Sequence, residues 1–137
     1  MRRPKARQCA ALPCRRDADG ALSVLLITSR ETRRWVAPKG WPMPERGSAG
    51  TAAREAFEEA GVLGVVSSPA IGRYVYEKRL SPKRAQRVEV EVHRLDVIEE
   101  LAEWPERSQR TRRWFTVREA AEAVEEEGLA ALILAIA

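Results

Sequence analysis

The chain has few of the residues on which several classes of protein depend. It contains two cysteines, Cys9 and Cys14, and a single histidine, His93. The cysteines are not in C-x-x-C spacing and one histidine adds little to a metal site, so we expect buried free thiols. No run approaches the roughly 20 apolar residues that span a bilayer, and the basic start MRRPKARQ lacks the apolar stretch of a secretory signal. We therefore expect no membrane partner and a cytoplasmic location.

What the chain does contain is the composition of a folded protein. Its 137 residues are 45% hydrophobic and 32% charged, which suits one compact domain with its own core and excludes a disordered chain. We expect residues 1–137 to form a single domain. The net charge of +4 and the pI of about 9.5 favour an anionic partner, either a phosphorylated metabolite or a nucleic acid.

Several segments have the pattern of β-strands. Residues 7–16 and 21–30 predict a hairpin closed by an Asp-Gly turn. Further strands are expected at 35–38, in one or two pieces at 65–80, at 86–98 and at 112–117. In the 86–98 segment, alternating valines predict one buried and one polar face, and the break in that alternation at Leu95 and Val97 predicts a bulge. Residues 118–137 are expected to be helical, with a break at Gly128.

The segment 38–61, PKGWPMPERGSAGTAAREAFEEAG, places a glutamate-rich helix after a glycine-rich loop. Glu55, Glu58 and Glu59 fall within an arc of about 100° of that helix, and we expect alanines and Phe57 on the opposite side to pack on a sheet. Like charges at i,i+4 repel, although Arg54 can pair with Glu58. Carboxylates grouped in this way suit Mg²⁺, which takes a few protein oxygens together with waters and phosphates. A solvated acidic face explains the helix pattern equally well.

A second acidic segment, residues 118–128, serves as a comparison. It follows no glycine-rich loop, so we interpret its glutamates as a solvated helix face. In the first segment, glycines allow close approach of a phosphate or metal to the backbone, and Gly61 suits the residue that ends a helix. The glycines of the loop are Gly40, Gly47 and Gly50.

The spacing of residues 40–62 resembles the Nudix box, G-x5-E-x7-R-E-U-x-E-E-x-G-U, where U is apolar. The matching positions are Gly40, Arg54, Glu55, Ala56, Glu58, Glu59, Gly61 and Val62. The lead-in PKGWP and the basic surroundings are most similar to the branch of diphosphoinositol polyphosphate phosphohydrolases and their bacterial relatives. This resemblance implies an α+β fold, an α/β/α sandwich with a mixed β-sheet between helices. It also implies hydrolysis of a diphosphate bond with Mg²⁺ or Mn²⁺.

The resemblance also implies roles for individual residues. Glu55 and Glu59 would be the main metal ligands, with Glu58 as a further ligand, and Arg54 would orient the carboxylates. A backbone carbonyl of Lys39 or Gly40 would complete the metal shell. The catalytic residues would then be Glu55, Arg54 and Glu58. Glu55 is the first candidate for the general base, and a glutamate of the later loop is the alternative. The loop candidates are Glu100, Glu103 and Glu106.

One position departs from the box. Its first glutamate should be residue 46, where this chain has Arg46, preceded by Glu45. Either a shift of the loop lets Glu45 substitute, or the position is dispensable and Arg46 faces a substrate phosphate. In both cases we expect activity to survive.

Two clusters of cations outside the box are candidates for selecting the substrate. They serve either as polyphosphate clamps or as solubilising charge. We count Lys39 and Arg46 with them as candidate substrate-binding residues, together with Arg34, Lys78, Arg79, Lys83 and Arg84. Trp41 or Trp104 would stack on a nucleotide base, or else fill the core or its rim.

The expected substrate is a phosphorylated small molecule, such as a diphosphoinositol polyphosphate, and we do not expect a nucleic-acid partner. One alternative is a pyrophosphatase of dinucleoside polyphosphates or nucleotide sugars. Another is a catalytically silent Nudix-like module that binds nucleic acid or a phosphorylated effector. The apolar tail 129–137 packs either on the core or on a second copy, which leaves a homodimer open.

Overall fold

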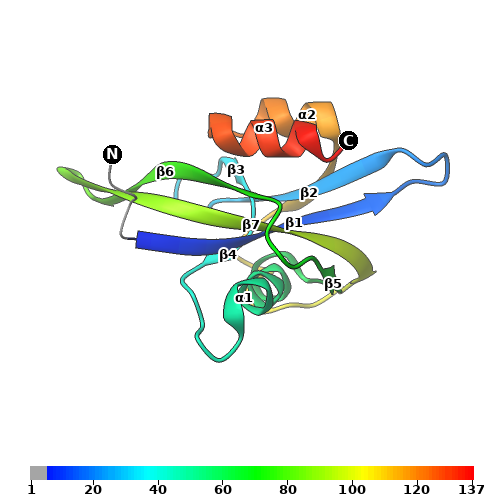
Figure 1. Ribbon diagram of the computed structural model, residues 1–137, viewed down its shortest axis with the longest axis horizontal. Helices are drawn as coiled ribbons and strands as arrows, with labels where there is room; N and C mark the ends of the chain where they lie inside the picture. Colours follow the sequence, from blue (N-terminus) through cyan, green and yellow to red (C-terminus); the bar gives the residue numbers. More distant parts are fainter. Residues whose placement is uncertain (1–5) are drawn as a thin grey trace.

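The strands assemble into one mixed, eight-stranded sheet in the computed structural model, which describes residues 6–137 (Figure 1). The basic start of the chain, residues 1–5, lies outside the described residues. The strands are β1 (Ala6–Arg16), β2 (Leu22–Thr28), β3 (Trp35–Val36), β4 (Lys39–Gly40), β5 (Val62–Val66), β6 (Gly72–Ser81), β7 (Arg84–Glu100) and β8 (Arg112–Thr116). The predicted hairpin is confirmed, since β1 pairs antiparallel with β2 and Cys14 lies opposite Val24.

The central strand of the sheet is β1. It runs parallel to β7 from Ala6–Val88 to Cys14–Asp96 and antiparallel to β2 and to the short β4. Strand β6 pairs antiparallel with β7 along the edge of β7 opposite to β1. Strand β8 pairs antiparallel with β2. Strand β4, which the sequence patterns did not predict, brings Gly40 opposite Cys9. This pairing places the start of the glycine-rich loop at the middle of the sheet.

Helices cover both faces of the sheet (Figure 1). On one face lie α1 (Gly47–Glu55) and its continuation, the π-helical turn η1 (Ala56–Ala60). On the other face lie α2 (Val117–Ala123) and α3 (Glu127–Ala135). Each face has its own apolar core, one built around Leu25, Ile27 and Leu95 beneath α1, the other around Leu26, Leu129 and Ile133 beneath α2 and α3. The predicted three-layer α/β/α sandwich is confirmed.

Strand β7 shows why its alternation breaks. Val88, Val90 and Val92 face the α2–α3 core, whereas Leu95 faces the α1 core. The pairing with β1 continues past Leu95 without a shift, so no bulge lies at Leu95. Directly after Val97 the pairing with β5 does shift, since Gly64 lies opposite Val97 and Leu63 lies opposite Glu99. The predicted irregularity is therefore found only beside Val97. The pattern breaks at Leu95 because both faces of this sheet are covered.

The helix of the glutamate-rich segment is rotated from the predicted orientation. Its fully buried alanines are Ala52, Ala56 and Ala60, and Phe57 lies on the outer side beneath the Arg54 guanidinium, 4.9 Å from the ring centre. Small side chains let this stripe approach the sheet closely. Glu55 and Glu59 flank it and are each only 8% exposed, rather than pointing away from the sheet. Gly61 ends the segment with φ of 67°, as predicted.

The C-terminal helical segment divides earlier than expected. It breaks at residues 124–126, where Val124 and Glu126 are extended, and not at Gly128, which lies inside α3. A side chain at Gly128 would meet the Cβ atom of Tyr74 at 2.6 Å. Glycine at this position therefore allows the first turn of α3 to rest directly on β6.

Two further findings concern the cysteines and possible membrane spans. Cys9 and Cys14 are both buried and free, as predicted, and burial raises the pKa of Cys14 to about 11. Within residues 6–137, no helix combines the length and the apolar character required to cross a bilayer.

Candidate functional site

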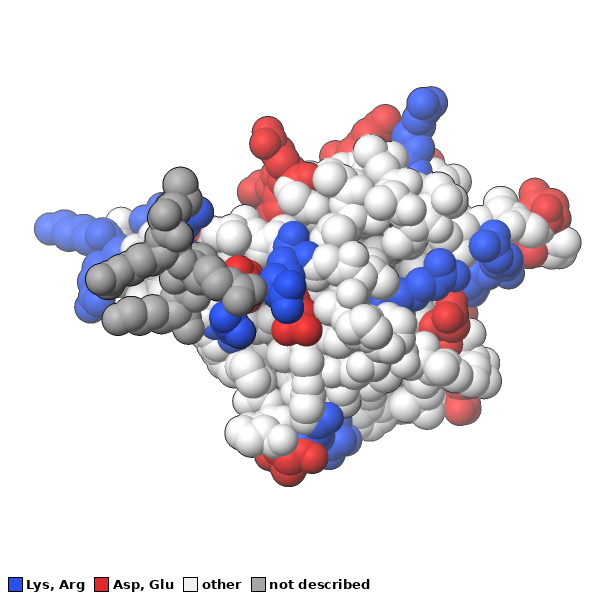
Figure 2. Space-filling model, viewed as in Figure 1, with Lys and Arg blue, Asp and Glu red and all other residues white. Residues whose placement is uncertain are grey.

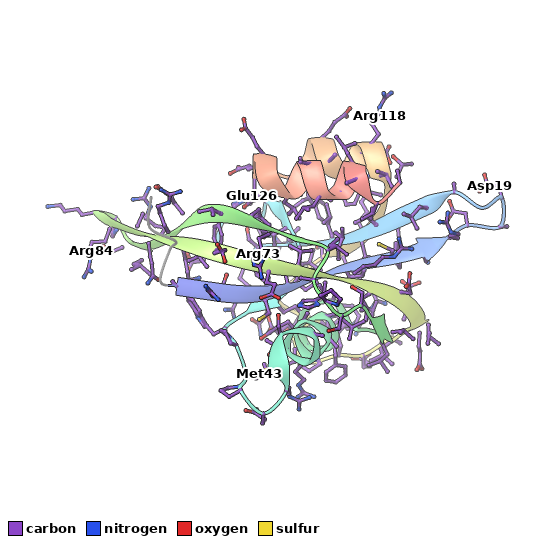
Figure 3. The ribbon with its side chains drawn as sticks, in the orientation of Figure 1. Asp19, Met43, Arg73, Arg84, Arg118 and Glu126 are labelled. Carbon is purple, nitrogen blue, oxygen red and sulfur yellow. The ribbon has the colours of Figure 1, made fainter. Side chains whose placement is uncertain are left out.

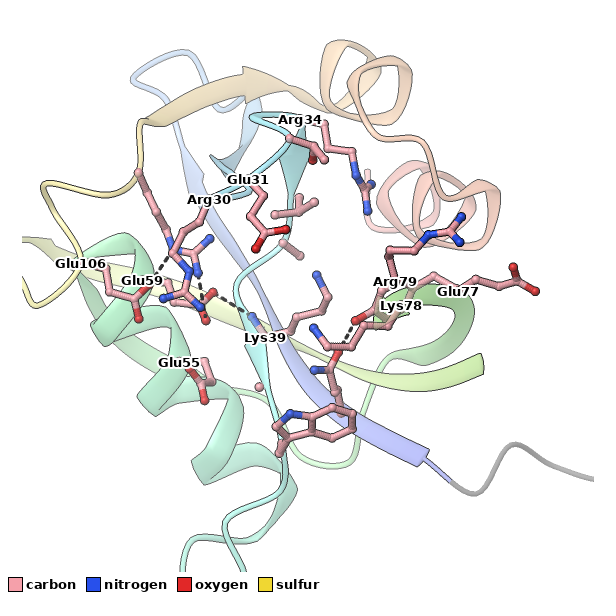
Figure 4. Close-up of a pocket in the computed structure, with 18 residues that line it drawn as sticks. Arg30, Glu31, Arg34, Lys39, Glu55, Glu59, Glu77, Lys78, Arg79 and Glu106 are labelled. Carbon is pink, nitrogen blue, oxygen red and sulfur yellow. Dashed lines mark hydrogen bonds and ion pairs between the residues drawn. The ribbon is translucent and has the colours of Figure 1, made fainter. Parts of the chain in front are cut away.

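A pocket of about 610 Å³ opens where β4, the end of α1, β6 and the loop after β2 meet (Figure 4). The loop between β7 and β8 closes one side of it with Glu106 and Arg110. The lining therefore comes from segments far apart in the sequence that the central strand β1 and its neighbours hold together. Its charged residues are the cations Arg30, Arg34, Lys39, Lys78, Arg79 and Arg110 and the carboxylates Glu31, Glu55, Glu59, Glu77 and Glu106.

The Glu55 carboxylate lies directly above Gly40. A Cβ atom built on Gly40 would overlap the Glu55 carboxyl group, so only glycine leaves room for this arrangement. The glycine that begins the box and its first helical glutamate are thus matched in space as well as in spacing. The contact fixes the acidic side of the pocket.

Glu59 is held on the same side by one hydrogen bond and one ion pair. The Lys39 backbone N–H donates to Glu59 Oε1 at 3.2 Å, and the Arg110 guanidinium lies 3.6 Å from Glu59 Oε2. Arg110 also donates to Glu106 Oε1 at 2.8 Å and to the Thr28 carbonyl at 3.1 Å. Arg110 therefore ties the β7–β8 loop to Glu59 of the helix.

Burial raises the pKa of both Glu55 and Glu59. For Glu59 the neighbouring Glu55 charge raises the pKa further, and the Arg110 charge lowers it. For Glu55 the charges of Glu58 and Glu106 also raise the pKa. Two buried carboxylates that disfavour ionisation in this way are ready to receive positive charge.

Glu58 is directed elsewhere. Its Oε1 accepts a hydrogen bond from Arg54 Nε at 2.8 Å, as the sequence predicts for this i,i+4 pair, and neither residue lines the pocket. Among the described residues, no three Cys, His, Asp or Glu side chains form a ready metal-binding group. Glu55 and Glu59 nevertheless fit Mg²⁺, which commonly takes one or two carboxylates and completes its shell with waters and phosphates.

The opposite wall of the pocket is basic and aromatic. The Lys39 ammonium lies 5.0 Å from the centre of the Tyr76 ring, and burial lowers the pKa of Lys39 to about 8. The Tyr76 hydroxyl donates to Gln8 Oε1 at 2.7 Å. Exposed Trp41 lies at the rim. An anionic group could thus enter between carboxylates on one side and cations on the other.

The structure brings seven of the predicted site residues to this pocket. They are Gly40, Glu55, Glu59, Lys39, Arg34, Lys78 and Arg79. Arg54, Glu58, Arg46, Lys83 and Arg84 do not line it. Arg46 is exposed at the start of α1, and Arg84 projects from the far tip of the β6–β7 hairpin (Figure 3), where Figure 2 shows other cations at the surface. The substrate-binding roles of Arg46, Lys83 and Arg84 stay predictions, as do the catalytic roles of Arg54 and Glu58.

Of the three loop glutamates considered as a general base, only Glu106 lines the pocket. Glu100 pairs with Arg15 at 2.8 Å, and Glu103 pairs with Arg107 at 2.9 Å. Trp104 packs against Gly61 and donates its indole N–H to the Glu59 carbonyl at 3.2 Å, so it supports the helix end instead of the pocket.

Sequence reasoning missed Gln8, Tyr76 and Arg110. Gln8 and Tyr76 lie on β1 and β6, two strands joined to β7, and no local pattern links them. Arg110 lies in a loop that contains several charged residues of both signs. Its role depends on the tertiary contact with Glu59, for which the sequence carries no signal.

Known proteins of one family are similar in sequence to this chain. The family description of the NUDIX domain matches residues 5–134. Nudix hydrolase 13, mitochondrial, of Arabidopsis thaliana is 36% identical over 111 residues, which cover 77% of this chain and 55% of that protein. Diphosphoinositol polyphosphate phosphohydrolase 3-alpha of Homo sapiens is 36% identical over 115 residues, covering 81% and 65%. The chain thus spans about half to two thirds of the length of these relatives.

Solved structures share the fold. The E. coli dihydroneopterin triphosphate pyrophosphohydrolase superposes with a TM-score of 0.68 at 13% identity, over 97% of this chain and 95% of that one. A C. elegans Ap4A hydrolase in a binary complex gives 0.67 at 17% identity, over 93% and 92%. Together with the box residues gathered around Gly40, the match over residues 5–134 shows that the chain belongs to the Nudix family.

Proposed function

We propose that this chain is a metal-dependent pyrophosphohydrolase that cleaves a diphosphate bond by attack of water at phosphorus. The observation that carries the proposal is the pair of buried carboxylates, Glu55 and Glu59, placed over Gly40 and opposite a wall of cations. Relatives named as hydrolases support it.

Glu55 and Glu59 would hold the cation, Mg²⁺ or Mn²⁺, between themselves and the substrate phosphates. A cation bound there lowers the pKa of water and neutralises charge on the phosphates. Glu106, which lines the pocket and accepts a hydrogen bond from Arg110 at 2.8 Å, would accept the proton of the attacking water. Lys39, Arg34, Lys78 and Arg79 would hold the phosphate oxygens from the opposite wall.

Two substrate classes fit this pocket. A diphosphoinositol polyphosphate is supported by the name of the human relative and by the cations of β6. A nucleoside linked to a diphosphate is supported by Trp41, which is 46% exposed at the pocket rim and free to stack on a base.

Phosphate release tests the proposal. The purified chain would be incubated with Mg²⁺ and, separately, with diphosphoinositol pentakisphosphate, diadenosine tetraphosphate, ADP-ribose and nucleoside triphosphates. We expect turnover of at least one of these, dependent on the metal and lost in Glu59→Gln. Absence of metal-dependent turnover on the whole panel would remove the proposal, and a Glu59→Gln variant as active as the wild type would refute the site.

A further inference from the structure

The helical turn that carries Glu59 is wider than a regular α-helix. In η1 the Gly61 N–H donates both to the Phe57 carbonyl, four residues back, and to the Ala56 carbonyl, five residues back. Turns of the wider, π-helical kind are rare and frequently lie at functional sites. The number of residues in a turn sets the direction of each side chain along it. The closure of this turn therefore decides where the carboxylate of Glu59 lies relative to that of Glu55.

Donors outside the helix bind the carbonyls at its end. A helix leaves its last four carbonyls without partners of its own, and here each of the four accepts a hydrogen bond from residues 104–112. The donors are the Glu106 N–H at 3.0 Å, the Trp104 indole N–H at 3.2 Å and Arg112 Nη1 at 3.0 and 3.2 Å. In the same order, the carbonyls are those of Glu58, Glu59, Ala60 and Gly61.

Arg112 and Trp104 form one unit against this helix end, which we call the helix-end clamp. Arg112 lies on β8 opposite Ile27, on the sheet face that α1 covers. Its guanidinium stacks 4.0 Å from the centre of the Trp104 ring, and its Nη2 donates to the Leu101 carbonyl at 2.7 Å. The Trp104 ring fills the space beside Gly61, where a Cβ atom would approach it to 2.5 Å. The planar, multiply donating guanidinium suits both contacts, and a lysine could not replace it.

We propose that Arg112 is a positioning residue for the pair of carboxylates Glu55 and Glu59, and that it acts through the backbone of the turn. The inference rests on the proposed function, because it concerns the residues that would hold the cation. Glu59 is fixed from two sides, since Trp104 binds its carbonyl and the Lys39 N–H binds its Oε1 at 3.2 Å. Loss of the clamp frees the turn to close differently and moves Glu59 relative to Glu55.

Binding of Mn²⁺ alone, followed by electron paramagnetic resonance of the free ion, tests the inference. Arg112→Met keeps an apolar stem and removes the donors to the helix end. We expect its affinity for Mn²⁺ to fall at least about tenfold, because groups that support metal ligands commonly contribute about 10- to 100-fold. Trp104→Phe keeps a ring beside Gly61 and removes only the N–H that binds the Glu59 carbonyl. Its affinity should fall in the same direction by a smaller factor.

Arg113→Met is the matched control. Arg113 is the next residue of β8, is exposed, and stacks on Phe115 at 4.7 Å on the side of the α2–α3 core. Its removal should leave the affinity for Mn²⁺ at the wild-type value. Both arginine variants lose one positive charge, and losing a cation by itself favours binding of Mn²⁺. A fall in affinity confined to Arg112→Met therefore reports the position of the carboxylates and not the net charge.

Metal binding separates this inference from the proposed function, because it needs no turnover. Weaker binding by Arg112→Met and Trp104→Phe supports the inference even if the wild type hydrolyses no substrate. A lower Tm with unchanged affinity in both variants would show that the clamp only stabilises the fold, and it would overturn the inference. The proposed function would survive that result if Glu59→Gln loses Mn²⁺. If Arg112→Met does not fold, Trp104→Phe decides, and a wild type that binds no Mn²⁺ would overturn both proposals.

Discussion

The Glu55 carboxyl group occupies the space in which any side chain at Gly40 would have to lie. The two residues are 15 positions apart in the sequence and meet because β4 pairs with β1 beneath α1. This contact makes the absence of a side chain at residue 40 a condition for the position of the carboxylate.

A Gly40→Ala substitution should therefore displace the Glu55 carboxylate while leaving the fold intact. The atoms that the new methyl group meets belong to the end of a flexible side chain, so Glu55 can rotate away at little cost in stability. Misplacing a metal ligand by about 1 Å can reduce kcat by about 100-fold. Steady-state kinetics should show this loss, with Tm close to that of the wild type.

The matched control is Gly20→Ala. Gly20 lies in the β1–β2 turn with φ of 87° and nothing near its missing side chain. An alanine there is strained by about 1 kcal/mol, so Tm should fall while kcat stays unchanged. If Gly40→Ala instead lowers Tm and spares kcat, the position of Glu55 does not matter for turnover.

Glu58→Gln and Glu59→Gln should differ although the residues are adjacent. Glu59 lies in the pocket, where a bound cation would contribute several kcal/mol to the reaction, so its loss should lower kcat at least about 100-fold. Glu58 contacts Arg54 outside the pocket lining, and its loss should cost about tenfold, the lower end of the effect of removing a group that supports metal ligands. Parallel measurements of kcat and of the apparent Mg²⁺ affinity compare the two. Equal effects would mean that Glu58 turns into the pocket when substrate binds.

Much of the fold could be predicted from the sequence because local patterns carried it. The β1–β2 hairpin follows from a turn pair between two apolar runs, and the end of η1 follows from Gly61, whose φ is positive. Strand β4 consists only of Lys39 and Gly40, two residue types that are depleted in strands, so no pattern marks it. The orientation of α1 was missed because its buried stripe consists of alanines, which give hydrophobic periodicity little contrast.

The candidate site, too, could be predicted only in part from the sequence. The spacing of the box locates Gly40, Glu55 and Glu59, and the i,i+4 spacing predicts the Arg54–Glu58 pair. Neither spacing predicts that this pair lies outside the pocket lining. Glu126 was grouped with the solvated glutamates of 118–128, since five similar residues in one segment look alike. Only the packing of α3 on Tyr74 makes one of them buried.

The two thiols should be unreactive in the folded protein. Cys14 is fully buried, and burial raises its pKa to about 11, while burial also raises the pKa of Cys9. Because the thiolate is the reactive form, a group whose pKa is raised stays protonated at neutral and mildly alkaline pH. Iodoacetamide at pH 8 should leave both cysteines unmodified by mass spectrometry, and both should react once denaturant is added. Rapid labelling without denaturant would show that strand β1 opens.

Arg110→Met tests how the β7–β8 loop is fastened to the site. Arg110 is 9% exposed and joins Glu106, Glu59 and the Thr28 carbonyl, so its removal leaves the carboxylates of Glu59 and Glu106 without their cation and should cost about 3 kcal/mol of unfolding free energy. On the same loop, Arg107 forms an exposed pair with Glu103, and Arg107→Met should cost less than about 1 kcal/mol. Urea denaturation of both variants gives the comparison. Mg²⁺ should recover part of the loss in Arg110→Met, because a cation that binds the folded site stabilises it and supplies positive charge beside Glu59. If the two variants are equally stable, or if Mg²⁺ leaves Arg110→Met unchanged, the ion pairs of Arg110 do not hold the loop to a cation site.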